Sequence, residues 1–289
     1  MELLRALGAL AEPPAEEHEM LAEVLGLPPA PDKTAYASIF LMQLYPYASV
    51  YLGNEGMLGG EARDRVAGFW RALQQEPPDE PDHVSSLLGL TANLAEAEAA
   101  ESDPASARLL RSTRAALLWE HLLPWLPAFL QRIEEVGGAF YAAWATLLQE
   151  ALRSELRDLG VLNVVPRHLT DAAGRADPRQ DGAEAFLTFL LTPVRSGLIL
   201  LRSDVSRAGD ELGLGLRTGE RSFVLKALLA QDPQQVLSWL ALEAGRQAAT
   251  HVVRLDGLGP ILEHWVGRSK GTADLLKSLA AEAEAVVPA

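Results

Sequence analysis

Cysteine is absent from the sequence, which excludes disulfide bridges, thiolate catalysis and cysteine-based metal sites. Long apolar runs are absent too, because stretches such as residues 197–201 are much shorter than the roughly 20 apolar residues of a membrane-spanning helix. The N-terminus lacks the basic segment of a secretory signal and becomes acidic within its first twenty residues. We therefore expect a cytoplasmic protein without stable membrane insertion.

Basic residues are scarce in the first half of the chain. The net charge is −14, and residues 1–158 hold 24 acidic and 11 basic residues, whereas residues 159–289 hold 15 and 14. Proteins bind nucleic acids mainly through Lys and Arg at the phosphates, so no nucleic-acid partner is expected. An acidic first half would instead attract a basic peptide. A surface that only keeps the protein soluble explains the charge equally well.

Catalytic motifs are lacking as well. The six histidines form no HExxH or comparable zinc spacing. The glycine clusters at 56–61 and 211–220 match neither a phosphate-binding nor a dinucleotide-binding loop, and a GxSxG nucleophile elbow is absent. The sequence thus favours a protein that is not an enzyme and that has no metal site and no cofactor.

What the sequence does contain is helical spacing of its apolar residues, with almost no alternating strand pattern. Residues 66–73 and 140–152 are clear examples. Residues of the types that cap helices precede several such stripes, namely Asp32, Asp82, Asp103, Thr192, Asp232 and Thr272. The fold class is therefore predicted to be all-α.

Two polar segments are predicted to be connectors. Residues 74–83 hold three prolines and four acidic residues, which predicts a stiff and exposed link. Residues 163–182 are rich in Gly, Pro and Asp, which is typical of a long loop. We therefore predict a helical domain at 1–160, a linker at 161–182 and a helical C-terminal region at 183–289.

The first connector ends in Glu-Pro-Asp-His at residues 80–83, directly before a predicted helix. Asp82 is in a position to cap that helix, and His83 in its first turn is expected to be neutral, because a helix N-terminus disfavours positive charge. In the structural interpretation, Asp82 is simply a helix cap and has no role in binding. In the functional interpretation, the link, the acid and the imidazole line a groove for a peptide.

A second unusual stretch is residues 120–130, which contain Pro124 and Pro127. Each proline removes a backbone donor, so a long helix must break or kink there. His121 and Trp125 lie four residues apart at this bend, on one face if the backbone stays helical. A buried, hydrogen-bonded His121 and a Trp125 in the core are the common outcome for such residues.

Taken together, these stretches form an ordered pattern: EPDHVSSLLGLTANLAE at 80–96, LLWEHLLPWLPAFLQRIEE at 117–135 and FYAAWATLLQEAL at 140–152. This pattern resembles the TorD/DmsD/NarJ family, and DmsD- and TorD-like members in particular, with a looser likeness over 33–75. The sequence departs from the family in that EPDH is one residue shorter than the usual E-P-x-D-H. The resemblance does not explain residues 160–289.

The resemblance implies a TorD-like helical bundle that acts as a chaperone and not as an enzyme. Such proteins bind the twin-arginine signal peptide, or another N-terminal segment, of a molybdopterin-dependent oxidoreductase and assist cofactor insertion before export or assembly. Carboxylates suit this partner, because they hold guanidinium groups in charge-assisted hydrogen bonds. The implied peptide-binding residues are Glu80, Pro81, Asp82 and His83, and the candidate lining residues are Tyr47, Tyr51, Trp70, His121 and Trp125.

Two other functions stay open. One is a helical adaptor without signal-peptide binding, whose C-terminal region recruits a partner. The other is weak GTP binding or hydrolysis, which no phosphate-binding loop in the sequence supports. The sequence also leaves homodimer formation open, and it does not reveal which oxidoreductase is served.

Overall fold

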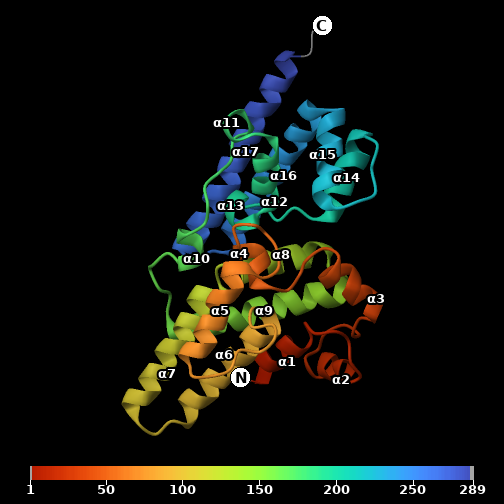
Figure 1. The fold of residues 1–289 in the computed structure, drawn as a ribbon. Helices are drawn as coiled ribbons and strands as arrows, with labels where there is room; N and C mark the ends of the chain where they lie inside the picture. Colours follow the sequence, from red (N-terminus) through yellow and green to blue (C-terminus); the bar gives the residue numbers. More distant parts are fainter. Residues whose placement is uncertain (1, 287–289) are drawn as a thin grey trace. The chain divides into compact units, whose positions relative to one another are not determined.

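The computed structural model describes residues 2–286 and confirms the all-α class (Figure 1). Seventeen α-helices and two short π-helical segments lie in this range, which contains no strand. None of the helices within it combines the length and the apolarity needed to cross a bilayer. Residue 1 of the predicted first domain and residues 287–289 of the predicted C-terminal region lie outside the described residues.

The helices form two compact units. Unit 1 comprises the residues up to Gly53 together with Met57–Thr170, and unit 2 comprises Asn54–Gly56 and the residues from Asp171 onward. The predicted linker at 161–182 contains two one-turn helices, α10 (Arg167–Thr170) and α11 (Pro178–Asp181). The prediction that residues 1–160 and 183–289 are separate domains that fold independently stays a proposal.

Unit 1 is built around the packing of α8 on α9 and of α6 on α1 and α7. Its core is aromatic, with Phe40 packed edge-on against Tyr141 at a ring distance of 4.8 Å, and Trp144 donating from its indole nitrogen to the Leu7 carbonyl at 2.9 Å. Its helices before α10 are α1 (Glu2–Ala9), α2 (Glu17–Val24), α3 (Lys33–Tyr36), η1 (Ala37–Leu41), α4 (Ala48–Leu52), α5 (Gly60–Ala72), α6 (Val84–Ala100), α7 (Pro104–Leu117), η2 (Leu118–Leu122), α8 (Leu126–Val136) and α9 (Gly138–Leu159).

Two of the predicted helix caps in unit 1 are confirmed. Asp32 accepts a hydrogen bond from the Ala35 amide at 2.7 Å, and Asp103 accepts one from the Ser106 amide at 2.9 Å, with proline in the first helical position. The predicted cap by Asp82 is wrong. The residue that caps α6 is His83, one position later.

The predicted break near Pro124 and Pro127 is confirmed. The chain leaves α7 through the π-helical segment η2, and α8 starts after Trp125, with Pro127 in its first turn. Proline is tolerated in a first turn because the amides there have no intrahelical partner. The Trp125 indole donates to the His121 carbonyl at 2.9 Å, so the tryptophan side chain itself satisfies a backbone acceptor at the bend.

A buried arginine joins three helices of unit 1. Arg114 of α7 is 4% exposed. Its guanidinium donates to Glu98 of α6 at 2.8 Å and to Asp158 of α9 at 2.9 Å, and it also donates to the buried Glu155. Because each of these hydrogen bonds is charge-assisted, the cluster stabilises the packing of α7 against both neighbours.

Unit 2 is built on the long antiparallel pair α16 and α17, which lie side by side (Figure 1). Its helices after α11 are α12 (Ala183–Leu191), α13 (Pro193–Ser196), α14 (Arg202–Leu212), α15 (Arg221–Gln231), α16 (Pro233–Arg254) and α17 (Pro260–Val286). The predicted start at Asp232 is confirmed by its hydrogen bond from the Gln235 amide at 2.9 Å. Thr272 was expected to begin a helix, which is wrong, because it lies inside α17 and donates to the Ser196 carbonyl at 2.7 Å.

A helix follows Thr192, as its residue type predicts, but this helix, α13, has only four residues. Thr192 makes no side-chain cap, and α13 ends at Ser196, where the left-handed backbone of Gly197 turns the chain into an extended segment. A β-carbon at Gly197 would lie 2.4 Å from the Ser269 backbone nitrogen, so only glycine fits this close approach. The apolar residues that follow are buried although they are not helical, as for Leu198 and Leu201.

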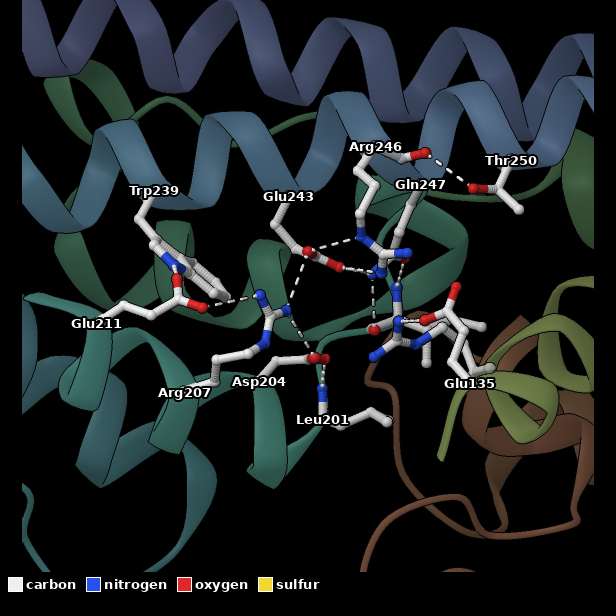
Figure 2. Close-up of polar contacts among 12 residues, drawn as sticks. Glu135, Leu201, Asp204, Arg207, Glu211, Trp239, Glu243, Arg246, Gln247 and Thr250 are labelled. Carbon is white, nitrogen blue, oxygen red and sulfur yellow. Dashed lines mark hydrogen bonds and ion pairs between the residues drawn. The ribbon is translucent and has the colours of Figure 1, made fainter. Parts of the chain in front are cut away.

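A polar network fastens α14 to α16 inside unit 2 (Figure 2). Arg207 donates to Asp204 at 3.3 Å and to Glu243 at 3.2 Å, and both carboxylates belong to residues that are 4% exposed. Gln247 in turn donates to Glu243 at 2.7 Å, and Arg207 lies over the ring of Trp239, 4.7 Å from its centroid. The buried carboxylates are thus compensated by hydrogen bonds, as burial of charge requires.

Candidate functional site

The Glu-Pro-Asp-His link lies against the segment that precedes α4. The Val84 amide donates to the Pro46 carbonyl at 2.9 Å, and the Ala48 amide donates to the Asp82 carbonyl at 3.0 Å. These two bonds pair Tyr47 with His83 in an antiparallel bridge. The link is therefore held by backbone pairing to a segment that is more than thirty residues away in the sequence.

The side chain of Asp82 contacts the start of α4 next to this pairing. Its side chain is buried, and its carboxylate accepts a hydrogen bond from the Ser49 amide at 3.0 Å. Ser49 is in the first turn of α4, where backbone amides lack intrahelical acceptors. Asp82 thus caps α4 from a distant part of the chain, and it does not cap the helix that follows it.

His83 connects the link to the loop after α1. The Ser85 amide donates to His83 Nδ1 at 3.2 Å, which caps α6. The Ser85 hydroxyl lies 2.7 Å from the same nitrogen and donates to the carboxylate of Glu12. His83 Nδ1 is 3.6 Å from Glu12 Oε1. The imidazole, the hydroxyl and the carboxylate therefore form a short polar chain that leads from a buried ring to a partly exposed anion.

Burial lowers the pKa of His83 below its ordinary value, and the negative charges of Glu12, Glu80 and Asp82 only partly oppose this effect. The neutral ring expected from the sequence agrees with this direction, but the cause is different. Burial of the imidazole has the largest effect, whereas the expectation rested on the helix N-terminus. With the proton on Nε2, a neutral His83 can accept the Ser85 amide hydrogen bond at Nδ1.

Two tyrosines complete this cluster. The ring of Tyr47 packs edge-on against His83 with 4.8 Å between the centroids. The pKa of Tyr47 is raised by burial and by a hydrogen bond to Glu80. The pKa of Tyr36 is raised to about 12 by burial and by the charges of Glu12 and Glu80. Both phenols therefore stay protonated at neutral pH and can donate hydrogen bonds.

The two carboxylates of the cluster are accessible. Glu80 is exposed, and 46% of the Glu12 side chain is exposed. Within residues 2–286, the side chain of Glu12 contacts Ser85 and His83, and that of Glu80 accepts a hydrogen bond from Tyr47. None of these contacts is an ion pair with Lys or Arg. This arrangement presents negative charge beside aromatic rings, which suits a guanidinium group.

The structure brings Tyr47, Glu80, Pro81, Asp82 and His83 together and places the other four predicted residues in other surroundings. Tyr51 and Trp125 are stacked with 5.2 Å between their rings, and both are fully buried in unit 1. Trp70 is half-buried on α5, and its indole nitrogen is buried without a hydrogen-bond partner. Tyr51 and Trp125 present no surface to a ligand in this structure. A role for these side chains in peptide binding stays a prediction.

His121 belongs to a buried imidazole pair. His121 Nδ1 lies 3.3 Å from His168 Nε2, and the ring of Phe69 packs edge-on against it at 5.0 Å. Burial, with a smaller contribution from Arg65, lowers the pKa of His121 to about 4. The common outcome for such a histidine, a buried ring with a hydrogen-bond partner, is therefore what the structure shows.

Sequence reasoning missed Glu12 and Ser85. Glu12 lies 71 positions before His83 and precedes two prolines, so no local spacing connects it with the link. The acidic character of the first half was the only signal. No group of three or more histidine or carboxylate side chains positioned to hold a metal occurs within residues 2–286.

Comparison with known proteins identifies relatives of the part of the chain that contains this cluster. A family model described as nitrate reductase delta subunit matches residues 9–131. Two curated proteins named chaperone protein TorD, from two strains of Vibrio cholerae serotype O1, are each 30% identical over 107 residues, which is 35% of this chain and 48% of theirs. The chain therefore spans about half the length of the curated relatives it matches. No solved structure matches.

Proposed function

We propose that this protein is a maturation chaperone for a molybdopterin-dependent oxidoreductase. The match of residues 9–131 to the nitrate reductase delta subunit family and the 30% identity to TorD chaperones over 107 residues support this proposal. The protein binds the twin-arginine signal peptide, or another basic N-terminal segment, of the unfinished enzyme in the cytoplasm. It acts by binding, without catalysis, and keeps the enzyme from export or assembly until its cofactor is inserted.

The observation that carries this proposal is the pair of accessible carboxylates at the link. Glu12 lies 3.6 Å from the His83 ring, and Glu80 accepts a hydrogen bond from Tyr47. Both carboxylates also raise the pKa values of Tyr36 and Tyr47. Two arginines need two acceptors of this kind, because each guanidinium forms paired hydrogen bonds with a carboxylate. The net charge of residues 1–158 adds long-range attraction for a basic peptide.

The link that carries Glu80 is held by contacts to the rest of unit 1. Asp82 and the backbone pairing of Tyr47 with His83 fix the link against α4, so little ordering is required when a peptide binds. Preorganisation of this kind raises affinity, because the entropy of ordering the site is lost on folding and not on binding.

The proposal is tested by calorimetric titration of the protein with a synthetic twin-arginine signal peptide. Peptides with both arginines replaced by alanine, and with both replaced by lysine, serve as controls, each at low and at moderate salt. We expect binding that weakens with salt, that is lost with alanine, and that is reduced with lysine, because lysine cannot form the paired hydrogen bonds. Equal binding of all three peptides contradicts the proposal.

A further inference from the structure

The long helix α16 has a second apolar face that unit 2 does not use. Leu242, Val252 and Val253 are 74%, 46% and 71% exposed. Leu242, Val253 and the small residue Ala249 recur at helical spacing along one side of the helix. Isolated exposed apolar residues are ordinary, whereas a continuous stripe of them on a long helix indicates an interaction surface.

Beside this stripe, α16 and α17 border a groove of about 520 Å³. Its α16 side is formed by the small residues Gly245, Ala248 and Ala249 together with Val252, and its α17 side carries Lys270, Asp274 and Lys277. The groove thus combines a shallow apolar wall with two cations, and the exposed stripe of α16 continues its apolar surface.

Packing within the chain does not explain why residue 245, which lines the groove, is a glycine. A β-carbon built on Gly245 meets no atom within 4 Å, so alanine would fit there. Glycine within a helix is destabilising relative to alanine. A partner that packs against the groove gives the missing side chain a purpose, because Gly245 and Ala249, one turn apart, allow a second helix to approach closely.

The charges of the groove indicate what kind of helix binds there. Lys270 and Lys277 are two of the four lysines in the whole chain, and they lie two turns apart on α17, about 10 Å along the axis. Asp274 is 3.8 Å from Lys277 and compensates one of the two charges. The groove is therefore positive, although the protein as a whole is acidic.

We propose that this groove binds an amphipathic α-helix of a partner protein, with apolar residues facing α16 and two acidic residues, two turns apart, facing the lysines. A second copy of this chain is a poorer occupant, because a two-fold contact would bring the lysines of both copies together. The inference is independent of the peptide site in unit 1.

The experiment measures binding of a fluorescently labelled synthetic helix to the full-length protein by anisotropy. The probe is an alanine- and leucine-based amphipathic peptide with two glutamates two turns apart, and its twin carries lysines instead. We expect the glutamate peptide to bind and the Lys270→Glu/Lys277→Glu variant to bind it about tenfold more weakly while gaining affinity for the lysine peptide. Lys226→Glu, an exposed lysine on α15, is the matched control.

A second variant tests the groove itself. Gly245→Leu fills it with a side chain whose β-carbon meets no atom within 4 Å, so we expect a folded protein with the same helix content and at least about tenfold weaker peptide binding. Equal binding by this variant, or no preference between the two peptides, overturns the proposal. The proposal is also overturned if sedimentation shows that the protein is a dimer and that Gly245→Leu is a monomer. In that case the groove is occupied by a second copy of this chain.

Discussion

Replacing Asp82 by alanine is expected to destabilise unit 1. The Asp82 carboxylate is 2% exposed and accepts the Ser49 amide at 3.0 Å. Its removal leaves a buried amide at the start of α4 without an acceptor. A hydrogen bond to a charged group contributes about 1.5–3 kcal/mol, and a lost helix cap costs about 0.5–2 kcal/mol for the same contact. We therefore expect a loss of about 2 kcal/mol in the free energy of unfolding.

The assay is urea denaturation followed by circular dichroism, with two comparison variants. Asp82→Asn keeps an acceptor oxygen without the charge, so it should recover part of the loss. Asp79→Ala removes an exposed carboxylate from the same link, and should change stability by less than about 0.5 kcal/mol. Equal stability of Asp82→Ala and Asp79→Ala would refute the assignment of Asp82 as the distant cap of α4.

Peptide affinity separates this role from a direct one. Under conditions in which Asp82→Ala is fully folded, the structure predicts that a signal peptide binds it less well only to the extent that the link has become mobile. Asp82→Asn, which retains the geometry, should bind almost as well as the unmodified protein. A large loss of affinity in Asp82→Asn at unchanged stability would instead mean that the Asp82 charge contacts the peptide.

Three further predictions concern stability. Because the unfolded chain takes up a proton on His121 below pH 6.5 whereas the folded protein does so only near pH 4, this residue should lower the free energy of unfolding by about 2 kcal/mol between pH 7 and pH 5. His121→Asn should reduce that dependence. The prediction is contradicted if the urea midpoint changes between pH 7 and pH 5 by the same amount in the unmodified protein and in His121→Asn. Arg114→Ala should cost about 3–5 kcal/mol, because Glu155 is left buried without its partner; replacing both residues by leucine should restore much of the loss in thermal unfolding. Gly245→Ala should stabilise the protein by up to about 1 kcal/mol in urea denaturation, and a loss of stability would show that the groove has no room for a methyl group.

Local signals in the sequence predicted the helices well. The apolar stripes need only neighbouring residues, and the Asp103-Pro104 cap is complete within four positions. The bend at Pro124 was equally predictable, because the missing amide of proline acts on the helix that contains it. These features depend on contacts between residues that are close in the sequence, so a single sequence carries enough information for them.

Contacts between distant segments were not predictable in this way. Asp82 has the residue type and position of a cap for α6, but it faces α4 because the link pairs with the segment around Tyr47. Thr272 is likewise a normal capping residue that lies inside α17, where a buried hydroxyl satisfies a carbonyl from another helix. The contribution of Glu12 to the site depends on how the loop after α1 packs, which no periodicity encodes.

The most direct test of the account is a titration of a twin-arginine signal peptide into the Glu12→Gln/Glu80→Gln double variant. Glu150→Gln, an exposed position on α9, is the matched control for the loss of negative charge. The account predicts that the double variant binds about tenfold or more weakly, with less dependence on salt, because each exposed charge contact contributes about 1 kcal/mol. Affinity equal to that of Glu150→Gln would contradict the central claim that these two carboxylates receive the arginines.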